Sequence, residues 1–249
     1  MSSLSLRDRV TNVVTRRIPG KRVREHLEAP VASFTFDDFP RSAWTIGGPI
    51  LARYDARATY YPAGVFCGET VDGIDYFDVD DLKACAAAGH EIGCHTFSHC
   101  RGAKTSSEAL VAEVEKNAAF IRGVLGDMPP SSFAYPYGEV TPRTKALFAK
   151  LFPVSRGIYP GVNTGKIDLA QLKAVPLELR SWDAAEIEGH IDHARATGGW
   201  IVFFSHDVSD DPSPYGATPQ MLEHALAAVK EAGIERLPVK HALARAAFG

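Results

Sequence analysis

Two adjacent carboxylates, Asp37 and Asp38, follow an apolar run at 31–36 that is typical of a buried strand. Neighbouring carboxylates repel each other and are costly to bury unless a cation compensates them. A bound metal ion would supply that compensation. The alternative is a solvated turn in which one Asp caps a helix. The pair therefore marks a candidate cation site at the end of a strand.

Two histidines, His95 and His99, lie four residues apart after a second apolar run at 91–94. On a helical turn this spacing places both imidazoles on one face, where they can bind the same metal ion. One carboxylate and two imidazoles leave coordination positions open, which is typical of catalytic rather than structural metal sites. Such nitrogen and oxygen ligands favour zinc, and they are also compatible with cobalt, nickel or manganese.

Two later segments also place chemically useful groups after apolar runs. The sequence Tyr135-Pro136-Tyr137-Gly138 bends the chain and frees backbone N–H groups that could bind a developing oxyanion. An aromatic turn packed in the core is the alternative. His206 follows the fully apolar run 200–205, and an imidazole can donate or accept a proton near neutral pH. A structural histidine is the alternative, but the position repeats the pattern of the earlier segments.

These residues lie in a chain that alternates strand-like runs with helical patterns. Strands are predicted at 31–36, 58–61, 91–94, 132–135, 154–156, 175–179, 200–205 and 235–237. Helices are predicted at 79–88, 106–125, 141–151, 183–197 and 218–232. Repeated β-then-α units imply parallel strands joined by right-handed crossovers. Seven or eight such units predict an α/β barrel, complete or incomplete, whose chemistry lies at the carboxyl ends of its strands.

The four segments, in this order, resemble the motifs of NodB-type polysaccharide deacetylases, carbohydrate esterase family four. The matching segments are Thr35-Phe36-Asp37-Asp38, His95-Thr96-Phe97-Ser98-His99, Tyr135-Pro136-Tyr137 and Phe204-Ser205-His206. The resemblance covers roughly residues 31–208. It implies a single-domain, distorted or incomplete parallel (β/α) barrel and a hydrolase with one divalent metal ion that removes N-acetyl groups from a carbohydrate.

The resemblance also implies a role for each matching residue. The implied metal ligands are Asp38, His95 and His99. Asp37 would be the general base and His206 the general acid, and the backbone N–H of Tyr137 would bind the oxyanion. Together with the metal, these groups would activate water and stabilise the tetrahedral species that forms when the amide is attacked.

Two positions depart from the family pattern. The third motif usually begins with an Arg that tethers the general base, but the chain has Ala134 there. Arg180 and Arg156 each follow a later strand and are candidates to replace it. The acid that tunes the last histidine is expected near Arg180-Ser181-Trp182-Asp183. Asp183 is the candidate, although it could instead cap the next helix.

Composition limits the function classes that need to be considered. The 249 residues are 45% hydrophobic and 23% charged, which excludes wholesale disorder. A net charge of −3 argues against a general nucleic-acid binder. The four cysteines form no CxxC pair, so we expect free buried thiols. The start of the chain lacks a secretory pattern, which favours a cytoplasmic location.

The N-terminal segment, residues 1–26, differs from residues 27–249, which we assign to the barrel. It carries seven Lys and Arg against two acidic residues, and an apolar stripe comprising Leu6, Val10, Val13 and Val14. The pattern predicts a basic amphipathic helix. Such a helix can lie on an anionic membrane surface, or it can pack against the barrel or a second copy of the chain. The sequence does not specify the oligomeric state.

Three functions are consistent with the sequence. The first is the metal-dependent removal of N-acetyl groups from a sugar. The second keeps the fold but acts on a small non-sugar amide, ureide or imide, which Ala134 and the missing secretory pattern favour. The third is a catalytically silent carbohydrate-binding protein, and the complete set of motif residues argues against it.

Overall fold

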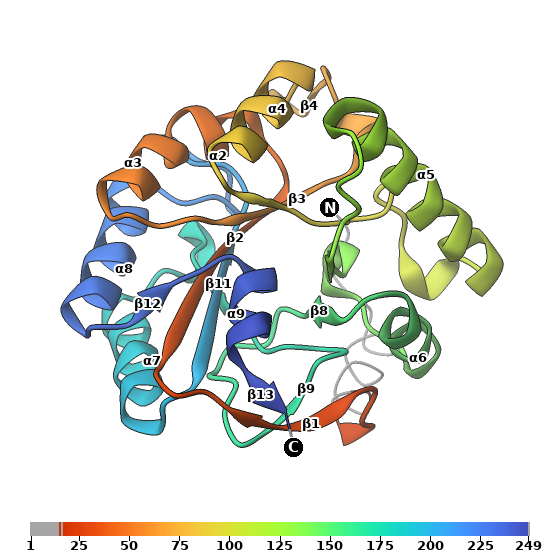
Figure 1. Ribbon diagram of the computed structural model, residues 1–249. Coiled ribbons are helices and arrows are strands. Elements are labelled where there is room, and N and C mark those ends of the chain that lie inside the picture. The colour runs from red at the N-terminus through yellow and green to blue at the C-terminus, as the bar shows by residue number, and fades with distance from the viewer. Residues whose placement is uncertain (1–14, 16, 249) are drawn as a thin grey trace.

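The computed structural model describes residues 15 and 17–248 of the chain (Figure 1). Its main parallel sheet has the strand order β10 (Val175–Pro176), β11 (Trp200–Ser205), β2 (Val31–Asp38), β3 (Thr59–Pro62) and β6 (Glu91–Ile92). A further strand, β12 (Glu235–Arg236), pairs with the first residues of β2. Two other parallel strands, β7 (Ser132–Ala134) and β8 (Val154–Arg156), form a separate pair. All eight predicted strands are therefore confirmed, some with shorter bounds.

Two single β-bridges connect the separate pair to the main sheet. Cys94 bridges to Phe133, which links the end of β6 to β7, and Arg156 bridges to Leu172, just before β10. The strands thus follow one another around a barrel whose hydrogen-bonded ladders are interrupted at both joins. This arrangement confirms the predicted distorted, incomplete parallel barrel.

Helices cover the outer side of the sheet (Figure 1). The five predicted helices are confirmed as α4 (Val79–Ala87), α5 (Ser107–Leu125), α6 (Pro142–Leu151), α7 (Ala184–Thr197) and α8 (Pro219–Glu231). Three short helices were not predicted: α2 (Arg41–Thr45), α3 (Gly47–Arg53) and α9 (Val239–Arg245). The starts of the predicted helices agree with the structure because a residue with a capping side chain precedes each helix. Ser106 and Thr141, for example, accept hydrogen bonds from the first turns of α5 and α6.

The core is built on the long pairing of β2 with β11, both of which are buried along their full length. Phe34 and Phe203 are register partners, and their rings stack 4.9 Å apart on the side covered by helices. Trp200 and Val202 point to the other side, where they join a second apolar cluster. Burial on both faces explains why these strands read as nearly continuous apolar runs.

Small antiparallel elements lie outside the barrel. They are the sheet of β13 (Ala247–Phe248), β1 (Arg22–His26) and β9 (Lys166–Asp168), and the hairpin of β4 (Thr70–Val71) with β5 (Ile74–Asp75). β1 forms the last part of the basic segment 1–26. The helix predicted for this segment depends on its apolar stripe. The apolar stripe from Leu6 to Val14 lies outside the described residues.

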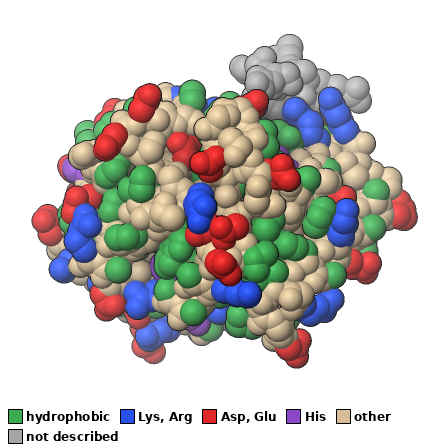
Figure 2. Space-filling model, turned by 90° about the horizontal axis from the view of Figure 1, so that it is seen from above, with side chains coloured by type: hydrophobic (Ala, Val, Ile, Leu, Met, Phe, Trp, Pro, Cys, Tyr) green, Lys and Arg blue, Asp and Glu red, His purple; other side chains and the backbone are tan. Residues whose placement is uncertain are grey.

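The surface and the cysteines can be compared with the expectations from composition. Acidic, basic and apolar side chains are interspersed on the face shown in Figure 2. All four cysteines are described and are free thiols; Cys85 and Cys94 are buried, and Cys67 and Cys100 are partly buried. Among residues 15 and 17–248, no helix combines the length and the apolar character required to cross a membrane.

Candidate active site

The carboxyl ends of the strands bring the predicted metal ligands together. Asp38 ends β2, and His95 and His99 follow β6. The Nε2 atoms of His95 and His99 lie 3.5 and 3.3 Å from Oδ1 of Asp38, and one ligand atom from each residue lies within 4.8 Å of the others. Three residues from the ends of β2 and β6, which β3 separates in the sheet, therefore converge at one point.

The donor set fits a divalent metal ion. Oδ1 of Asp38 is buried and, within the described part of the chain, accepts no hydrogen bond. Nδ1 of His95 donates to the carbonyl of Ala134 at 2.8 Å, which leaves the Nε2 lone pair facing Asp38. Burial lowers the pKa of both His95 and His99 to about 4, so both imidazoles are neutral at pH 7. Neutral imidazoles beside a carboxylate are suitable metal ligands.

The loop that carries the two histidines corrects one sequence expectation. We expected His95 and His99 to share a helical turn, but residues 95–99 form a bent loop without helix. Thr96 and His99 have positive φ angles, 62° and 49°, which no α-helix accommodates. Hydrogen bonds hold the loop instead: the Ser98 N–H donates to Glu113 Oε2, and the Cys100 N–H donates to Thr96 Oγ1.

Backbone strain is concentrated at this site. Left-handed φ angles occur at seven described residues other than glycine, and five of these seven lie in the site segments: Asp38, Phe39, Thr96, His99 and Tyr137. Such conformations are uncommon for residues with a Cβ atom and persist where the surrounding structure enforces them. The strain therefore supports a functional reason for the positions of these side chains.

The predicted general base, Asp37, is buried and forms an ion pair with Arg156. Burial alone would raise the pKa of Asp37, but the charges of Arg156, His95 and His206 outweigh it and hold the pKa below its ordinary value. Arg156 ends β8, where its register partner in β7 is Ala134. The cation that the family motif carries at position 134 therefore comes from the neighbouring strand.

Two other predictions, Arg180 as a partner of Asp37 and Asp183 as the acid beside His206, are not supported by the contacts of these residues. Nε of Arg180 donates to Oε2 of Glu178 at 2.7 Å, and its guanidinium lies 4.1 Å from the ring centre of Tyr215, so Arg156 and not Arg180 pairs with Asp37. Asp183 is exposed and accepts hydrogen bonds from the backbone of Ala185 and Glu186. It caps α7, which is the alternative that the sequence left open.

The acid beside the last histidine is Glu178, which sequence reasoning missed. Its side chain is 2% exposed, and Oε1 lies 4.0 Å from Nδ1 of His206. Burial raises the pKa of Glu178. Nδ1 of His206 also donates to the carbonyl of Tyr215 at 3.2 Å, and Nε2 lies 4.0 Å from Oδ2 of Asp38. Glu178 follows β10, so the strand-end pattern could have identified it.

Tyr137 lies in a short 3₁₀ turn, Pro136–Gly138, beside the candidate metal ligand His99. Its ring lies 4.3 Å from the ring of His99 and 4.8 Å from the guanidinium of Arg101, measured to the ring centre of Tyr137. Gly138 has a φ of 63°, and a Cβ atom there would lie 2.3 Å from Ile158. The turn therefore requires this glycine, and it places Tyr137 over the second histidine.

A family model described as "Polysaccharide deacetylase" matches residues 24–151, just over half of the chain. The chain belongs to the polysaccharide deacetylase family. This confirms the resemblance of the four motifs to NodB-type enzymes of carbohydrate esterase family four. The matched region of this deacetylase-family chain contains the three candidate metal ligands and Asp37, and it ends before Arg156, Glu178 and His206.

Known proteins are similar to the chain in sequence or in fold. Chitin deacetylase 1 of Cryptococcus neoformans is 30% identical over 111 residues, which is 45% of this chain but only 20% of that protein. The Bc1960 peptidoglycan N-acetylglucosamine deacetylase has a TM-score of 0.63 at 17% identity, covering 93% of this chain and 96% of its own. A CE4 family pseudoenzyme from Bacillus anthracis has a TM-score of 0.60 at 15% identity, with coverages of 89% and 68%.

Proposed function

We propose that this deacetylase-family protein removes N-acetyl groups from a carbohydrate by metal-dependent hydrolysis. The observation that carries the proposal is the convergence of Asp38, His95 and His99, with Asp37 and His206 beside them. The similarity to a chitin deacetylase and to a peptidoglycan N-acetylglucosamine deacetylase supports an N-acetylated sugar as the substrate.

Asp38, His95 and His99 would hold one divalent ion, for which this donor set favours zinc, with cobalt, nickel or manganese as alternatives. When bound, the ion would lower the pKa of water and polarise the acyl carbonyl. The other steps fall to the residues around it. An acetamide is a poor electrophile with a poor leaving group, so both attack and departure require proton transfer.

Asp37 would accept the proton from the attacking water. Its lowered pKa keeps it ionised at neutral pH, and the ion pair with Arg156 fixes the direction of its carboxylate. The backbone N–H of Tyr137 would donate to the developing oxyanion. His206 would then protonate the departing amine. The carbonyl of Tyr215 and the carboxylate of Glu178 orient its imidazole for this step.

The two other functions have less support. A small amide, ureide or imide as substrate was favoured by the missing Arg at position 134, but Arg156 supplies a cation to Asp37 from the paired position. A catalytically silent binding protein is compatible with this fold, because one protein with a similar structure is a pseudoenzyme. The presence of base, acid and metal ligands at one site supports catalysis instead.

The test is acetate release from N-acetylglucosamine oligomers by metal-loaded protein, with ureides and imides assayed in parallel. We expect Asp37→Asn to retain one equivalent of metal and to lose at least about 100-fold in kcat, the lower range for a general base. The exposed capping residue provides the control variant, Asp183→Asn, which should keep kcat. Full activity in metal-bound Asp37→Asn would refute the assigned base. Turnover of ureides without acetate release from sugars would support the second function.

A further inference from the structure

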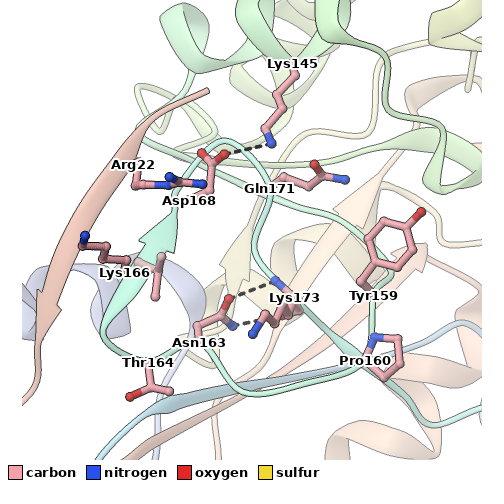
Figure 3. Close-up of a pocket in the computed structure, with 11 residues that line it drawn as sticks. Arg22, Lys145, Tyr159, Pro160, Asn163, Thr164, Lys166, Asp168, Gln171 and Lys173 are labelled. Atoms are coloured by element: carbon pink, nitrogen blue, oxygen red, sulfur yellow. Dashed lines mark hydrogen bonds and ion pairs between the residues drawn. The ribbon is translucent and has the colours of Figure 1, made fainter. Parts of the chain in front are cut away.

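A cavity of about 260 Å³ lies between β1, the helix α6 and the chain around β9 (Figure 3). Its lining includes none of the residues assigned above to the metal cluster or to proton transfer. It is smaller than the cavities of about 300–1,000 Å³ that hold drug-sized molecules, so it suits a small group and not a sugar polymer.

The cavity is lined by more positive than negative charge. Four cationic side chains and one carboxylate line it: Arg22, Lys145, Lys166, Lys173 and Asp168. Lys145, which is buried, pairs with Oδ2 of Asp168 at 2.8 Å, as the dashed line in Figure 3 shows. This leaves three positive charges without a matching carboxylate in the lining.

The single carboxylate of the lining, that of Asp168, is already bound by neighbouring groups. Besides Lys145, Asp168 accepts hydrogen bonds from the backbone N–H groups of Gly20, Lys21 and Ala170 at 2.8–3.1 Å. It therefore has little capacity left to neutralise the other lysines. Within residues 15 and 17–248, neither Arg22 nor Lys166 forms an ion pair, and Nζ of Lys173 donates to the carbonyl of Val162.

A buried carboxamide in the lining supports a bound ligand independently of the charges. Gln171 is 8% exposed, and neither its Oε1 nor its Nε2 has a hydrogen-bond partner in the described structure. Asn163, which also lines the cavity, donates to two carbonyls and accepts from the Lys173 N–H. Buried side-chain amides are normally satisfied, as Asn163 is, so the free carboxamide of Gln171 requires a partner.

We propose that this cavity binds a small ligand through a phosphate group. A phosphate monoester carries close to two negative charges at pH 7 and several acceptor oxygens, which match three unneutralised cations better than a single carboxylate does. Arg and Lys side chains are well suited to phosphate oxygens, and the Gln171 amide can donate to one of them. Its carbonyl can accept a bond from a hydroxyl of the same ligand.

The test is calorimetric titration of metal-free, chelator-treated protein with inorganic phosphate and, separately, with glucose 6-phosphate. We expect saturable binding to one site. Lys166→Ala and Gln171→Leu should each weaken it at least about tenfold, as expected for loss of a charged hydrogen bond. Lys150→Ala removes an exposed lysine of α6 outside the cavity and should leave binding unchanged. Tighter binding of glucose 6-phosphate would identify a phosphate ester as the ligand, and equal binding would identify free phosphate.

Three results would overturn the proposal. They are the absence of saturable binding, equal affinity in the Lys166→Ala and Lys150→Ala variants, and loss of binding in Asp38→Asn, which would place the anion at the metal cluster. Thermal unfolding of each variant verifies that it is folded, and Lys166 is exposed, so its substitution is tolerated most easily. Because the titration uses metal-free protein and measures no turnover, its outcome is independent of the proposed deacetylase activity.

Discussion

The guanidinium of Arg156 forms a buried ion pair with the carboxylate of Asp37, 119 residues away in the sequence. Arg156 is also the register partner of Ala134, at the position where the family motif usually has Arg. β7 thus lacks the cation, and its neighbour β8 supplies it at the same level of the barrel. This relationship leads to a test of where the cation can reside.

We predict that Arg156→Ala lowers kcat for acetate release at least about 100-fold, because the general base loses the group that orients it. It should also destabilise the fold by about 3–5 kcal/mol, since Asp37 is left buried without its partner. Arg156→Lys keeps the charge and should retain more of both. Acetate assays and denaturant unfolding measure the two effects.

Returning the arginine to the family position should rescue the first variant. We expect Ala134→Arg combined with Arg156→Ala to recover activity relative to Arg156→Ala alone, since the two positions face each other across β7 and β8. Lys150→Ala, at an exposed position, is the control for nonspecific effects. A double variant that is folded and binds metal, but is no more active than Arg156→Ala, would contradict the idea that the two positions are interchangeable.

Glu178 and Asp183 provide a matched pair for the acid that serves His206. We predict that Glu178→Gln lowers kcat about tenfold or more with unchanged metal affinity, because the imidazole of His206 loses the nearby carboxylate that orients it for proton transfer. Asp183→Ala should leave kcat unchanged and cost about 1 kcal/mol of stability, the usual effect of removing an N-cap. The opposite pattern would return the assignment to Asp183.

Long periodic elements and strand ends were predictable from the sequence. The helix predicted at 106–125 is α5, and the continuous apolar run at 200–205 is β11. Both were recognised because the local sequence pattern determines them. Asp37, Asp38 and His206 were found for the same reason, since each follows such a strand. The short helices α2 and α3 were not predicted, because they have no side-chain cap and are too short to show a repeating apolar pattern.

Contacts between distant strands were not predictable in this way. The choice of Arg156 over Arg180 depends on strand register, and both follow predicted strands in the sequence. The left-handed residues Thr96 and His99 depend on hydrogen bonds with groups outside the usual helical pattern, so spacing alone favoured a helical turn. Glu178 follows a strand, as the other site residues do, but the family motif indicates Asp183 instead.

Removal of the metal ligands should abolish metal binding without unfolding the barrel. We predict that Asp38→Ala, His95→Ala and His99→Ala each lose zinc affinity by at least about 100-fold, whereas His193→Ala, at an exposed position of α7, keeps it. Zinc at 100 times its Kd should stabilise the wild type by about 2.7 kcal/mol and the three variants far less. Metal content and thermal unfolding with and without zinc provide the measurements. Equal stabilisation of His99→Ala and wild type would contradict the assigned cluster.

A buried histidine outside the site should make stability depend on pH. His90 is 7% exposed, and its Nδ1 accepts a hydrogen bond from the Ala58 N–H, which requires the neutral ring. Burial, with a smaller effect from Arg57, lowers its pKa from 6.5 to about 4. Between these values the unfolded chain binds the proton and the folded chain does not, so stability falls as the pH drops from about 6.5 to about 4.

The corresponding loss is about 3 kcal/mol for a difference of this size. His90→Asn keeps an acceptor for the Ala58 N–H but does not titrate in this range. We therefore expect the variant to be less stable than wild type at pH 7, because Asn is smaller, yet to lose about 3 kcal/mol less on acidification to pH 4. Denaturant unfolding of both proteins in their metal-free forms at several pH values measures the difference. His95 and His99 are present in both proteins, so their contribution to the pH dependence of stability is the same in each. Parallel curves for the two proteins would show that His90 does not contribute.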